Sequence, residues 1–528
     1  MVAGLGYRLV QLTNQERRFL QDQSEARVNR IQTIHNKRGH ILDRHGKVLA
    51  MSEPKRSLWV NPKSLFADNS KQKAIAELAG ISEEKLEKMV NTHKDKHFMF
   101  LKRRVESAVI EKALEQNDLP LKTIEDFDRF YPAGESSAQL LGQVDVDGKG
   151  IEGLELMLEQ KLSGREGFKK VVINRYGETV QNVQETAAKD GEDVYLTIDK
   201  NIQYQAYRAL QKGVENAGAK AGMAVVLDVK TGGVLAAVNF PSFNPQKHGV
   251  HNAYKKNRAF IDLFEPGSTF KPISMSYVLE QKKAENLTVV DTGPGVWVLN
   301  NQKVSDVRNF GVLKVDDILM RSSNIGIAKL VLSCGQNFVN WLEQKFPVGK
   351  KSLAEYPGEP KGRINHPGET QLFDKASISY GYGVSMTVLQ LAQAYLQIAN
   401  GGYAQDVSII KQNTDKALQK KRILAPETVT RVKSMMKKVV SNTGTGRLGQ
   451  VKGLEVAGKT GTTHLYTNKG YAEDRYIASF SGFAPLDKPQ YVICVVIEEP
   501  DKAMHYGGQV AAPIFSEILF HMLYLDAS

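Results

Sequence analysis

The position of the strongest strand-forming segments constrains the fold more than any other feature. They form two groups far apart in the sequence: Met223–Asp228 with Val234–Asn239, and Tyr476–Phe483 with Tyr491–Ile497. Each is a short apolar run typical of a buried strand. A helical pattern precedes the first group at Asn201–Gly218, and another follows the second at Pro513–Leu525. This order predicts one large domain, closed by an antiparallel sheet whose strands come from both of its ends, with a long helical segment between them.

The segment before this domain has a more mixed pattern. Residues 13–36 are polar and helix-like, and Arg38–Ala50 predicts two short strands around a turn. Residues 70–117 carry helical runs with charged faces, and Phe130–Gly153 is rich in glycine and turns. We therefore expect an irregular α+β module in this part of the chain.

A polar stretch at 185–192 lies between this module and a strand expected at Asp193–Ile198. The expected organisation is an N-terminal module at 13–192 and a larger domain at 193–528, so that the whole chain belongs to the α+β class. Residues 1–12 are apolar with one arginine, and we interpret them as the stump of a membrane anchor. No segment reaches the 18 apolar residues that predict a complete transmembrane helix.

Composition excludes several classes of protein. The chain has 528 residues, of which 41% are hydrophobic and 24% charged, as is typical of globular domains. The net charge is +12, but the basic residues are scattered in pairs and match no nucleic-acid-binding motif, so we expect no nucleic acid partner. The two cysteines, Cys334 and Cys494, have apolar neighbours and predict buried small side chains rather than a disulfide framework or a metal site.

A serine three residues before a lysine has chemical meaning, because one helical turn brings both side chains to one face and the amine can accept the hydroxyl proton. Ser268 and Lys271 form such a pair, and further pairs are Ser70/Lys73, Ser82/Lys85, Ser408/Lys411 and Ser434/Lys437. Ser268 differs because it follows Glu-Pro-Gly and opens an apolar helical run, in which Pro272 is tolerated only in the first turn. We therefore expect Ser268 at a helix start, and Lys271 among apolar residues that lower its pKa.

Two further motifs follow Ser268. Ser322-Ser323-Asn324 offers a hydroxyl that can relay a proton and an amide that can hold a peptide substrate. Lys459-Thr460-Gly461-Thr462 offers an ammonium group, a hydroxyl and an exposed strand edge. Other matches to these two patterns, at 242–244 and 230–232, come before Ser268. The set that starts at Ser268 runs in the order S-x-x-K, S-x-N, K-T-G, which is the order in serine acyl-transferases that react with penicillin.

With these motifs the chain resembles the class B penicillin-binding proteins. The resemblance rests on NRAFIDLFEPGSTFKP, RSSNIGIAKL, SYGYGVSMTVLQLAQAY, AGKTGT, YIASFSGFAP and YGGQVAAPIF in the C-terminal part. In the N-terminal part, RGHILDRHGKVLA, RFYPAGESSAQLLG and GIEGLE resemble the pedestal module of the same class. The resemblance implies a pedestal for dimerisation or interaction, followed by a transpeptidase domain. That domain is expected to have an antiparallel sheet flanked by helices, with a helical subdomain. The compact pedestal and the FEPGST and SSN motifs favour the cell-division branch over the elongation branch.

The resemblance also implies catalytic roles. Ser268 is expected to attack the penultimate D-Ala carbonyl of a D-Ala-D-Ala stem peptide, with Lys271 as its base. Ser322 and Lys459 are expected to carry the proton to the leaving amine.

The remaining motif residues are expected to bind the substrate. Asn324 would orient the substrate amide, and the hydroxyls of Thr460 and Thr462, on either side of Gly461, would hold the substrate carboxylate. The backbone N–H groups of Ser268 and Thr462 would form the oxyanion hole. No metal or organic cofactor is implied. Thr463 departs from the alanine of many relatives, which could reshape the substrate groove.

The implied partners are peptidoglycan stem peptides, β-lactam antibiotics, and FtsW with other divisome membrane proteins. The implied location is the bacterial inner membrane, with one N-terminal helix as anchor and the catalytic domain in the periplasm; this chain would lack most of the anchor. Three alternatives stay open: an elongation-specific transpeptidase, a hydrolase such as a β-lactamase or a D,D-carboxypeptidase, and a sensor or scaffold that β-lactams acylate without turnover of stem peptides.

Overall fold

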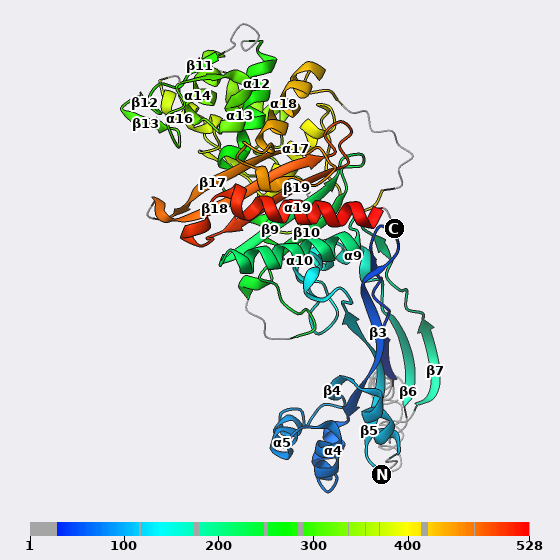
Figure 1. Ribbon diagram of the computed structural model, residues 1–528. Coiled ribbons are helices and arrows are strands. Elements are labelled where there is room, and N and C mark those ends of the chain that lie inside the picture. Colours follow the sequence, from blue (N-terminus) through cyan, green and yellow to red (C-terminus); the bar gives the residue numbers. More distant parts are fainter. Residues whose placement is uncertain are drawn as a thin grey trace, which may run out of the picture.

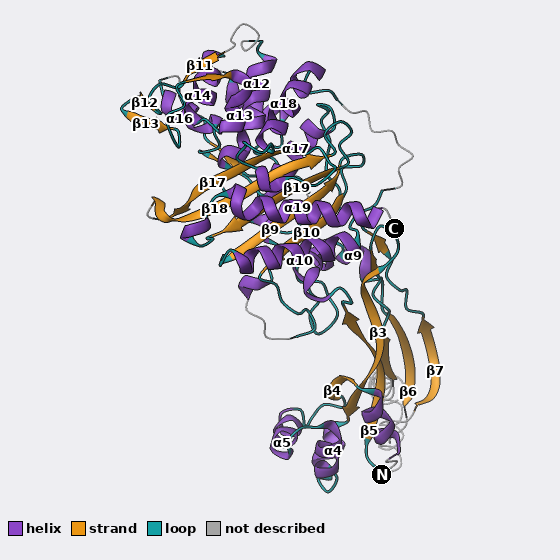
Figure 2. Cartoon of the chain, in the orientation of Figure 1, coloured by secondary structure: helices purple, strands orange, loops and turns teal. Residues whose placement is uncertain are grey.

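The computed structural model describes residues 29–115, 118–173, 179–247, 252–282, 289–335, 337–353, 355–368, 370–412, 421–468 and 470–526. Figure 1 shows a broad body that contains the C-terminal part of the chain, and a narrow pedestal that extends from it and contains the N-terminal strands. Helices surround the sheet of the body, whereas long strands dominate the pedestal (Figure 2). The expected anchor stump at 1–12 lies outside the described residues.

The body is built on an antiparallel sheet of five strands in the order β10-β9-β19-β18-β17. Its strands are β9 (Ala221–Asp228), β10 (Val234–Phe240), β17 (Ala457–Thr467), β18 (Gly470–Ala484) and β19 (Tyr491–Glu498). β19 pairs with β9 along its whole length, with Tyr491 opposite Asp228 and Glu498 opposite Ala221. Strands from both ends of the domain therefore meet in one sheet, which confirms the prediction from their order.

Both faces of this sheet are covered, which explains the unbroken apolar runs in its strands. α10 (Lys200–Asn216) and α19 (Gly507–Asp526) lie side by side on one face (Figure 1), where Leu210, Ile493 and Phe515 belong to one apolar cluster. Burying such a side chain contributes about 1.5–3 kcal/mol. α17 (Val388–Ala399), all of whose residues are buried, packs against β9 and β19. The predicted helix at Pro513 begins earlier, at Gly507, because the proline lies inside α19 rather than in its first turn.

A helical subdomain lies between β10 and β17 in the sequence. Its helices are α11 (Arg258–Ile261), α12 (Lys271–Glu280), α13 (Ile318–Arg321), α14 (Asn324–Ser333), α15 (Phe338–Lys345), α16 (Leu372–Ser379) and α18 (Pro426–Val439). Small antiparallel pairs accompany them: β11 (Val289–Asp291) with β14 (Val312–Lys314), β12 (Val296–Leu299) with β13 (Gln302–Ser305), and β15 (Arg363–Ile364) with β16 (Val384–Ser385). The fold class, α+β with a helical subdomain, is as predicted.

The pedestal is organised around β3 (Val48–Val60), which pairs with β4 (Met99–Val105) and β5 (Leu121–Phe130). Four helices, α3 (Pro62–Ala67), α4 (Gln72–Ala79), α5 (Glu83–Thr92) and α6 (Ser107–Glu115), accompany this sheet and share an apolar cluster with it. A second sheet has the order β1 (Asn29–Ile34), β6 (Gly167–Ile173), β7 (Thr179–Thr186). Short helices α7 (Ala138–Leu141), α8 (Gly153–Met157) and α9 (Glu159–Leu162) lead back to the body.

Three local predictions for the pedestal need correction. The expected helix at 13–36 is wrong where it is described, because Asn29–Ile34 forms β1 and pairs with β6. The helical expectation for 70–117 holds for α4, α5 and α6 but misses β4, which pairs with β3. The second strand expected within Arg38–Ala50 continues to Val60, because it finds partners in β5 along this length. In all three cases a distant strand decided the structure, which local pattern does not show.

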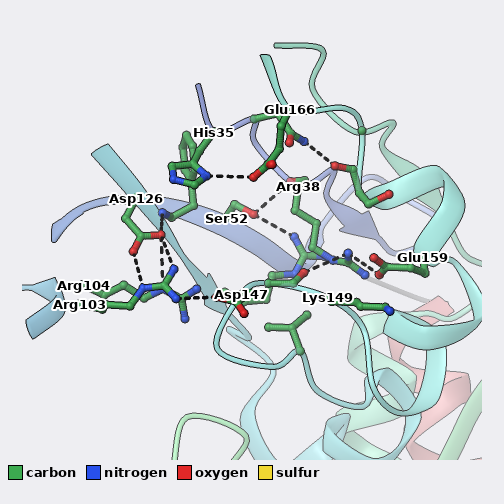
Figure 3. A pocket seen from close by; sticks show the side chains of 17 residues that line it. His35, Arg38, Ser52, Arg103, Arg104, Asp126, Asp147, Lys149, Glu159 and Glu166 are labelled. Carbon is green, nitrogen blue, oxygen red and sulfur yellow. Dashed lines mark hydrogen bonds and ion pairs between the residues drawn. The ribbon is translucent and has the colours of Figure 1, made fainter. Parts of the chain in front are cut away.

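The pedestal motifs meet in a buried ionic cluster of Arg38, Arg129 and Glu155. Arg38 Nε and Arg129 Nε each donate to Glu155 at 2.7 Å, one to each carboxylate oxygen, and Glu155 is fully buried. Arg38 also donates to Glu159 at 2.7 Å, on the wall of a pocket of about 390 Å³ (Figure 3). Because two cations share one buried carboxylate, the cluster fixes three distant segments of the pedestal to one another.

Asp43 joins the pedestal to the body. Its fully buried carboxylate accepts from the N–H groups of His45 and Lys47 in the predicted turn, and from the N–H of Lys200 at the start of α10. Nearby, β2 (Ile41–Leu42) pairs in parallel with β8 (Val194–Tyr195), a strand shorter than predicted. A segment near the start of the pedestal and the first residues of the body are therefore held together by hydrogen bonds.

Cys494 is buried in β19, as predicted, whereas Cys334 is only half-buried after α14. Within the described ranges, no helix combines the length and the apolar character needed to span a bilayer.

Candidate active site

Ser268 lies at a helix start, as predicted. Gly267–Phe270 form a short 3-10 turn that continues directly into α12, and Pro272 lies in the first turn of that helix. Gly267 has a φ of 52°, and a Cβ atom there would lie 2.2 Å from Cγ2 of Thr463. Glycine is therefore required for the serine turn to pack against β17.

Lys271 is fully buried on α12. Its Nζ donates to the Ser322 carbonyl at 2.6 Å and to Asn324 Oδ1 at 2.7 Å, and lies 3.3 Å from Ser322 Oγ. Burial lowers the pKa of Lys271 to about 7, and the negative charge of Asp306 partly opposes this effect. The pKa of this amine is thus lowered toward neutrality, in the direction that the apolar sequence around it predicts.

Ser322 links Ser268 to both lysines. Its Oγ lies 3.0 Å from Ser268 Oγ and 2.9 Å from Lys459 Nζ. The residue ends α13 in a left-handed conformation, with φ 58° and ψ 37°, which costs a non-glycine residue roughly 1 kcal/mol. The next residue, Ser323, caps α14 by accepting the N–H of Gly326, so that the start of this helix sustains the strained turn.

Lys459 approaches from β17, the edge strand of the five-stranded sheet. It is fully buried, and its Nζ also donates to the Thr460 carbonyl at 2.9 Å. Burial and the neighbouring positive charge of Lys271 lower the pKa of Lys459 well below its usual value. Two lysines from distant segments therefore share one hydroxyl, that of Ser322.

The other residues of the K-T-G-T motif follow along β17. The Thr460 hydroxyl donates to Thr445 Oγ1 at 3.1 Å, and Thr462 Oγ1 accepts the N–H of Gly507 at 3.0 Å. At Gly461 a Cβ atom would lie 2.3 Å from Ser479 Oγ, so the strand needs glycine here. Thr463 is buried against Gly267, so that its side chain fills the space beside the serine turn.

Sequence reasoning missed four residues that support the site. Asp306 accepts three hydrogen bonds from the segment that starts α14. Thr445 accepts from Thr460, the Tyr395 hydroxyl donates to the Thr269 carbonyl at 2.7 Å, and Glu265 accepts from Gly383 N–H at 2.8 Å. Asp306 and Thr445 lie outside every quoted motif, whereas Glu265 and Tyr395 lie within quoted stretches that gave them no role. Each is far from its partner in sequence, so only the fold shows the contact.

The other motif matches lie elsewhere. Ser82 caps α5 in the pedestal, and the Lys411 ammonium donates to the Arg44 carbonyl. Ser242 donates to the Glu135 carbonyl, and Lys230 lies in the turn between β9 and β10. The hydrogen bonds of these matches therefore connect them to other parts of the chain than the Ser268 set.

The comparisons with known proteins agree with this geometry. Residues 222–520 match the model of the penicillin-binding protein transpeptidase domain, and residues 33–196 match that of the penicillin-binding protein dimerisation domain. The chain is 35% identical to a probable peptidoglycan D,D-transpeptidase PenA of Neisseria meningitidis, over 98% of this chain and 90% of that protein. It is 32% identical to the peptidoglycan D,D-transpeptidase FtsI of Escherichia coli, over 95% of this chain and 86% of that protein.

A solved structure of similar fold is penicillin-binding protein 3 of Mycobacterium tuberculosis in complex with aztreonam. It has a TM-score of 0.71 and 26% identity, and the match covers 94% of this chain and 97% of that one. The matches to both domain models cover most of the chain. The protein belongs to the penicillin-binding protein family and consists of a dimerisation domain followed by a transpeptidase domain.

Proposed function

We propose that this chain cross-links peptidoglycan stem peptides at the division septum, through an acyl-enzyme on Ser268 that β-lactams also form. One observation carries the chemistry: Ser322 Oγ lies within hydrogen-bond distance of Ser268 Oγ and of two buried lysines. The names of the relatives, D,D-transpeptidases PenA and FtsI, support the substrate class.

The hydrogen bonds of Lys271 suggest how Ser268 is activated. A neutral amine has two N–H groups and one lone pair, and Lys271 has two close acceptors, the Ser322 carbonyl and Asn324 Oδ1. The lone pair is then left for the direction of Ser322 Oγ, 3.3 Å away. The Ser268 proton can pass through the rotatable Ser322 hydroxyl to Lys271 as Ser268 attacks the carbonyl of the penultimate D-Ala.

The second half of the site serves the leaving group. When the peptide bond breaks, the terminal D-Ala needs a proton on its amine, and Ser322 with Lys459 supplies it along the 2.9 Å contact. The acyl-enzyme on Ser268 is then attacked by an amine of a neighbouring stem peptide, which forms the cross-link and frees the serine.

β17 and the α14 start provide the substrate contacts. Because β17 is an edge strand, an extended stem peptide can lie along it, with the N–H groups of Ser268 and Thr462 as oxyanion hole. The Thr462 oxygen already accepts the Gly507 N–H, which leaves its proton for the substrate carboxylate. Thr460 can do the same when its hydroxyl turns from Thr445, and the Asn324 amide orients the substrate.

The chemistry is tested by incubating the protein and a Ser268→Ala variant with a fluorescent penicillin and following label and intact mass over hours. We expect a stable adduct on the parent alone. Rapid loss of the adduct would indicate a hydrolase, and an adduct without turnover of stem peptides would indicate a sensor. An adduct that does not depend on Ser268 would overturn the proposal.

The septal role rests on the FtsI relatives, and with it we propose divisome membrane proteins such as FtsW as partners and a periplasmic location at the inner membrane. Depletion of the protein in its own bacterium tests this role. Filaments without septa are the expected result, whereas rounded cells that still divide would favour the elongation-specific alternative.

A further inference from the structure

One carboxylate controls the start of α14, next to the catalytic residues. Asp306 Oδ1 accepts the N–H of Asn324 at 2.6 Å and that of Ile325 at 3.1 Å, and Oδ2 accepts the Ser323 hydroxyl at 2.6 Å. These donors lie at a helix N-terminus, where a negative charge is favourable. Asp306 therefore caps α14 from outside that helix, after the end of β13.

The end of β13 makes a second contact with the start of α14. The carbonyl of Ser305, the last residue of β13, accepts the Asn324 side-chain N–H at 2.9 Å, so that Asn324 Oδ1 is directed to the Lys271 ammonium at 2.7 Å. Asp306 is itself held by its N–H, which donates to the Gly295 carbonyl at 3.0 Å. The contacts thus run continuously from the β12–β13 hairpin to Lys271.

We propose that Asp306 is a positioning residue of the acyl-transfer reaction, which holds the Ser322–Asn324 loop in place and acts on Lys271 through its negative charge. The proposal rests on the function proposed above but goes beyond it, because it adds a residue outside the three motifs. The proposal has two separate consequences. Asp306 fixes the geometry of the loop, and its charge raises the proton affinity of Lys271.

The charges around Lys271 determine the direction of the second effect. Lys459 faces it from β17, Ser322 and Asn324 are neutral, and Asp306 is the acidic group that favours its protonated form. Removing the Asp306 charge lowers the pKa of Lys271 below its present value of about 7. The lysine would then be a neutral base at lower pH, so the acidic limb of the acylation rate would move to lower pH.

Two variants separate the two effects. Asp306→Asn removes the charge and weakens the hydrogen bonds, whereas Ser323→Ala removes the hydrogen bonds to Asp306 and from the Gly326 N–H and keeps the charge. The matched control is Glu343→Gln, a carboxylate-to-amide change on α15 in the same subdomain. The measurement is the second-order rate of Ser268 acylation by a fluorescent penicillin from pH 5 to 9, together with the thermal midpoint of each variant.

We expect Asp306→Asn to lower the maximal rate by about tenfold or more and to move the acidic limb down by about one pH unit. Ser323→Ala should lower the rate without moving the limb, and Glu343→Gln should change neither. The inference would be overturned if the acidic limb of the acylation rate of Asp306→Asn stayed at the parental pH. It would also be overturned if Ser323→Ala moved this limb as far as Asp306→Asn does. If Asp306→Asn does not fold, Asp306→Glu takes its place, with an unmoved limb and a lower rate expected. Failure of the parent to be acylated at Ser268 would instead sink the proposed function itself.

Discussion

The pedestal and the active site both bury charged side chains, but they treat them in opposite ways. In the pedestal, Arg38 and Arg129 each contact the buried Glu155 at 2.7 Å. Burial disfavours the charge on Arg38, yet Glu155 and Glu159 raise its pKa overall. In the active site, Lys271 and Lys459 are buried with oxygen acceptors as their close partners, and the pKa of each is lowered.

The difference shows what a buried charge is for in each place. A cation that shares a buried carboxylate stays charged and holds segments together, whereas a buried amine whose close partners are neutral oxygen acceptors tends to lose its proton. The first arrangement contributes to structure, and the second creates a base. The comparison can be tested by changing one group at a time in each region.

The largest expected effect is on catalysis. Replacing Lys271 by Met removes the base but keeps a long side chain that suits an apolar environment, so we expect the acylation rate to fall by about 10³. The free energy of unfolding should stay the same or rise, because no buried amine needs desolvation. Stopped-flow acylation and urea denaturation measure the two quantities. A loss of unfolding free energy as large as that expected for Glu155→Gln would contradict the contrast between the active site and the pedestal.

Glu155→Gln should have the reverse signature. It leaves two buried guanidinium groups without their shared negative charge, so we expect a loss of about 3 kcal/mol in unfolding free energy. Urea denaturation is the measurement. Glu166→Gln changes a largely exposed partner of His35 on the wall of the pocket that Arg38 also lines; it is the control and should cost less than about 0.5 kcal/mol. Equal losses for the two variants would show that burial of the carboxylate does not increase the cost of removing its charge.

The pH dependence of the unaltered protein gives the third prediction. Because the pKa of Lys271 is lowered to about 7, its neutral form increases as pH rises through 7. The acylation rate should increase over the same range and fall about tenfold per pH unit well below it. Rate measurements between pH 5 and 9 check this behaviour. A flat profile from pH 5 upward would show that another group activates Ser268.

A neutral buried hydrogen bond should have the smallest effect. Tyr395→Phe removes the hydroxyl that donates to the Thr269 carbonyl, one residue after Ser268. We expect a loss of about 1 kcal/mol in unfolding free energy and a change in acylation rate of about twofold. Thermal denaturation and acylation kinetics are the measurements. An effect as large as that of Glu155→Gln would mean that the charge of a buried group is not what sets its importance.

Two features of this protein are encoded in local sequence pattern and could be predicted: the apolar strands of the main sheet and the helix start at Ser268. The strands β9, β10 and β19 and the second half of β18 are apolar runs, and Ser268 follows a glycine and precedes an early proline, so the sequence alone predicted both features. The roles of β1 and β4 did not, because pairing with β6 and β3 decided them.

The same limit applies within the site. The three motifs gave the residues that converge on Ser322, including both lysines. Asp306 and Thr445 stayed hidden, because each acts through a hydrogen bond to a residue 15 or more positions away. A carboxylate that caps a helix from a neighbouring hairpin leaves no pattern in that helix's own sequence.

The pairing of β19 with β9 has a consequence for biosynthesis. Residues 491–498 lie in the middle of the sheet, with partners at 221–228 on one side and 477–484 on the other. A growing chain can pair the pedestal strands β3 and β5 early, but it cannot complete the catalytic sheet until β19 has been made. Translation that stops before this strand would therefore yield a chain that has the serine motif but lacks the strand that joins the β10–β9 pair to the β18–β17 pair.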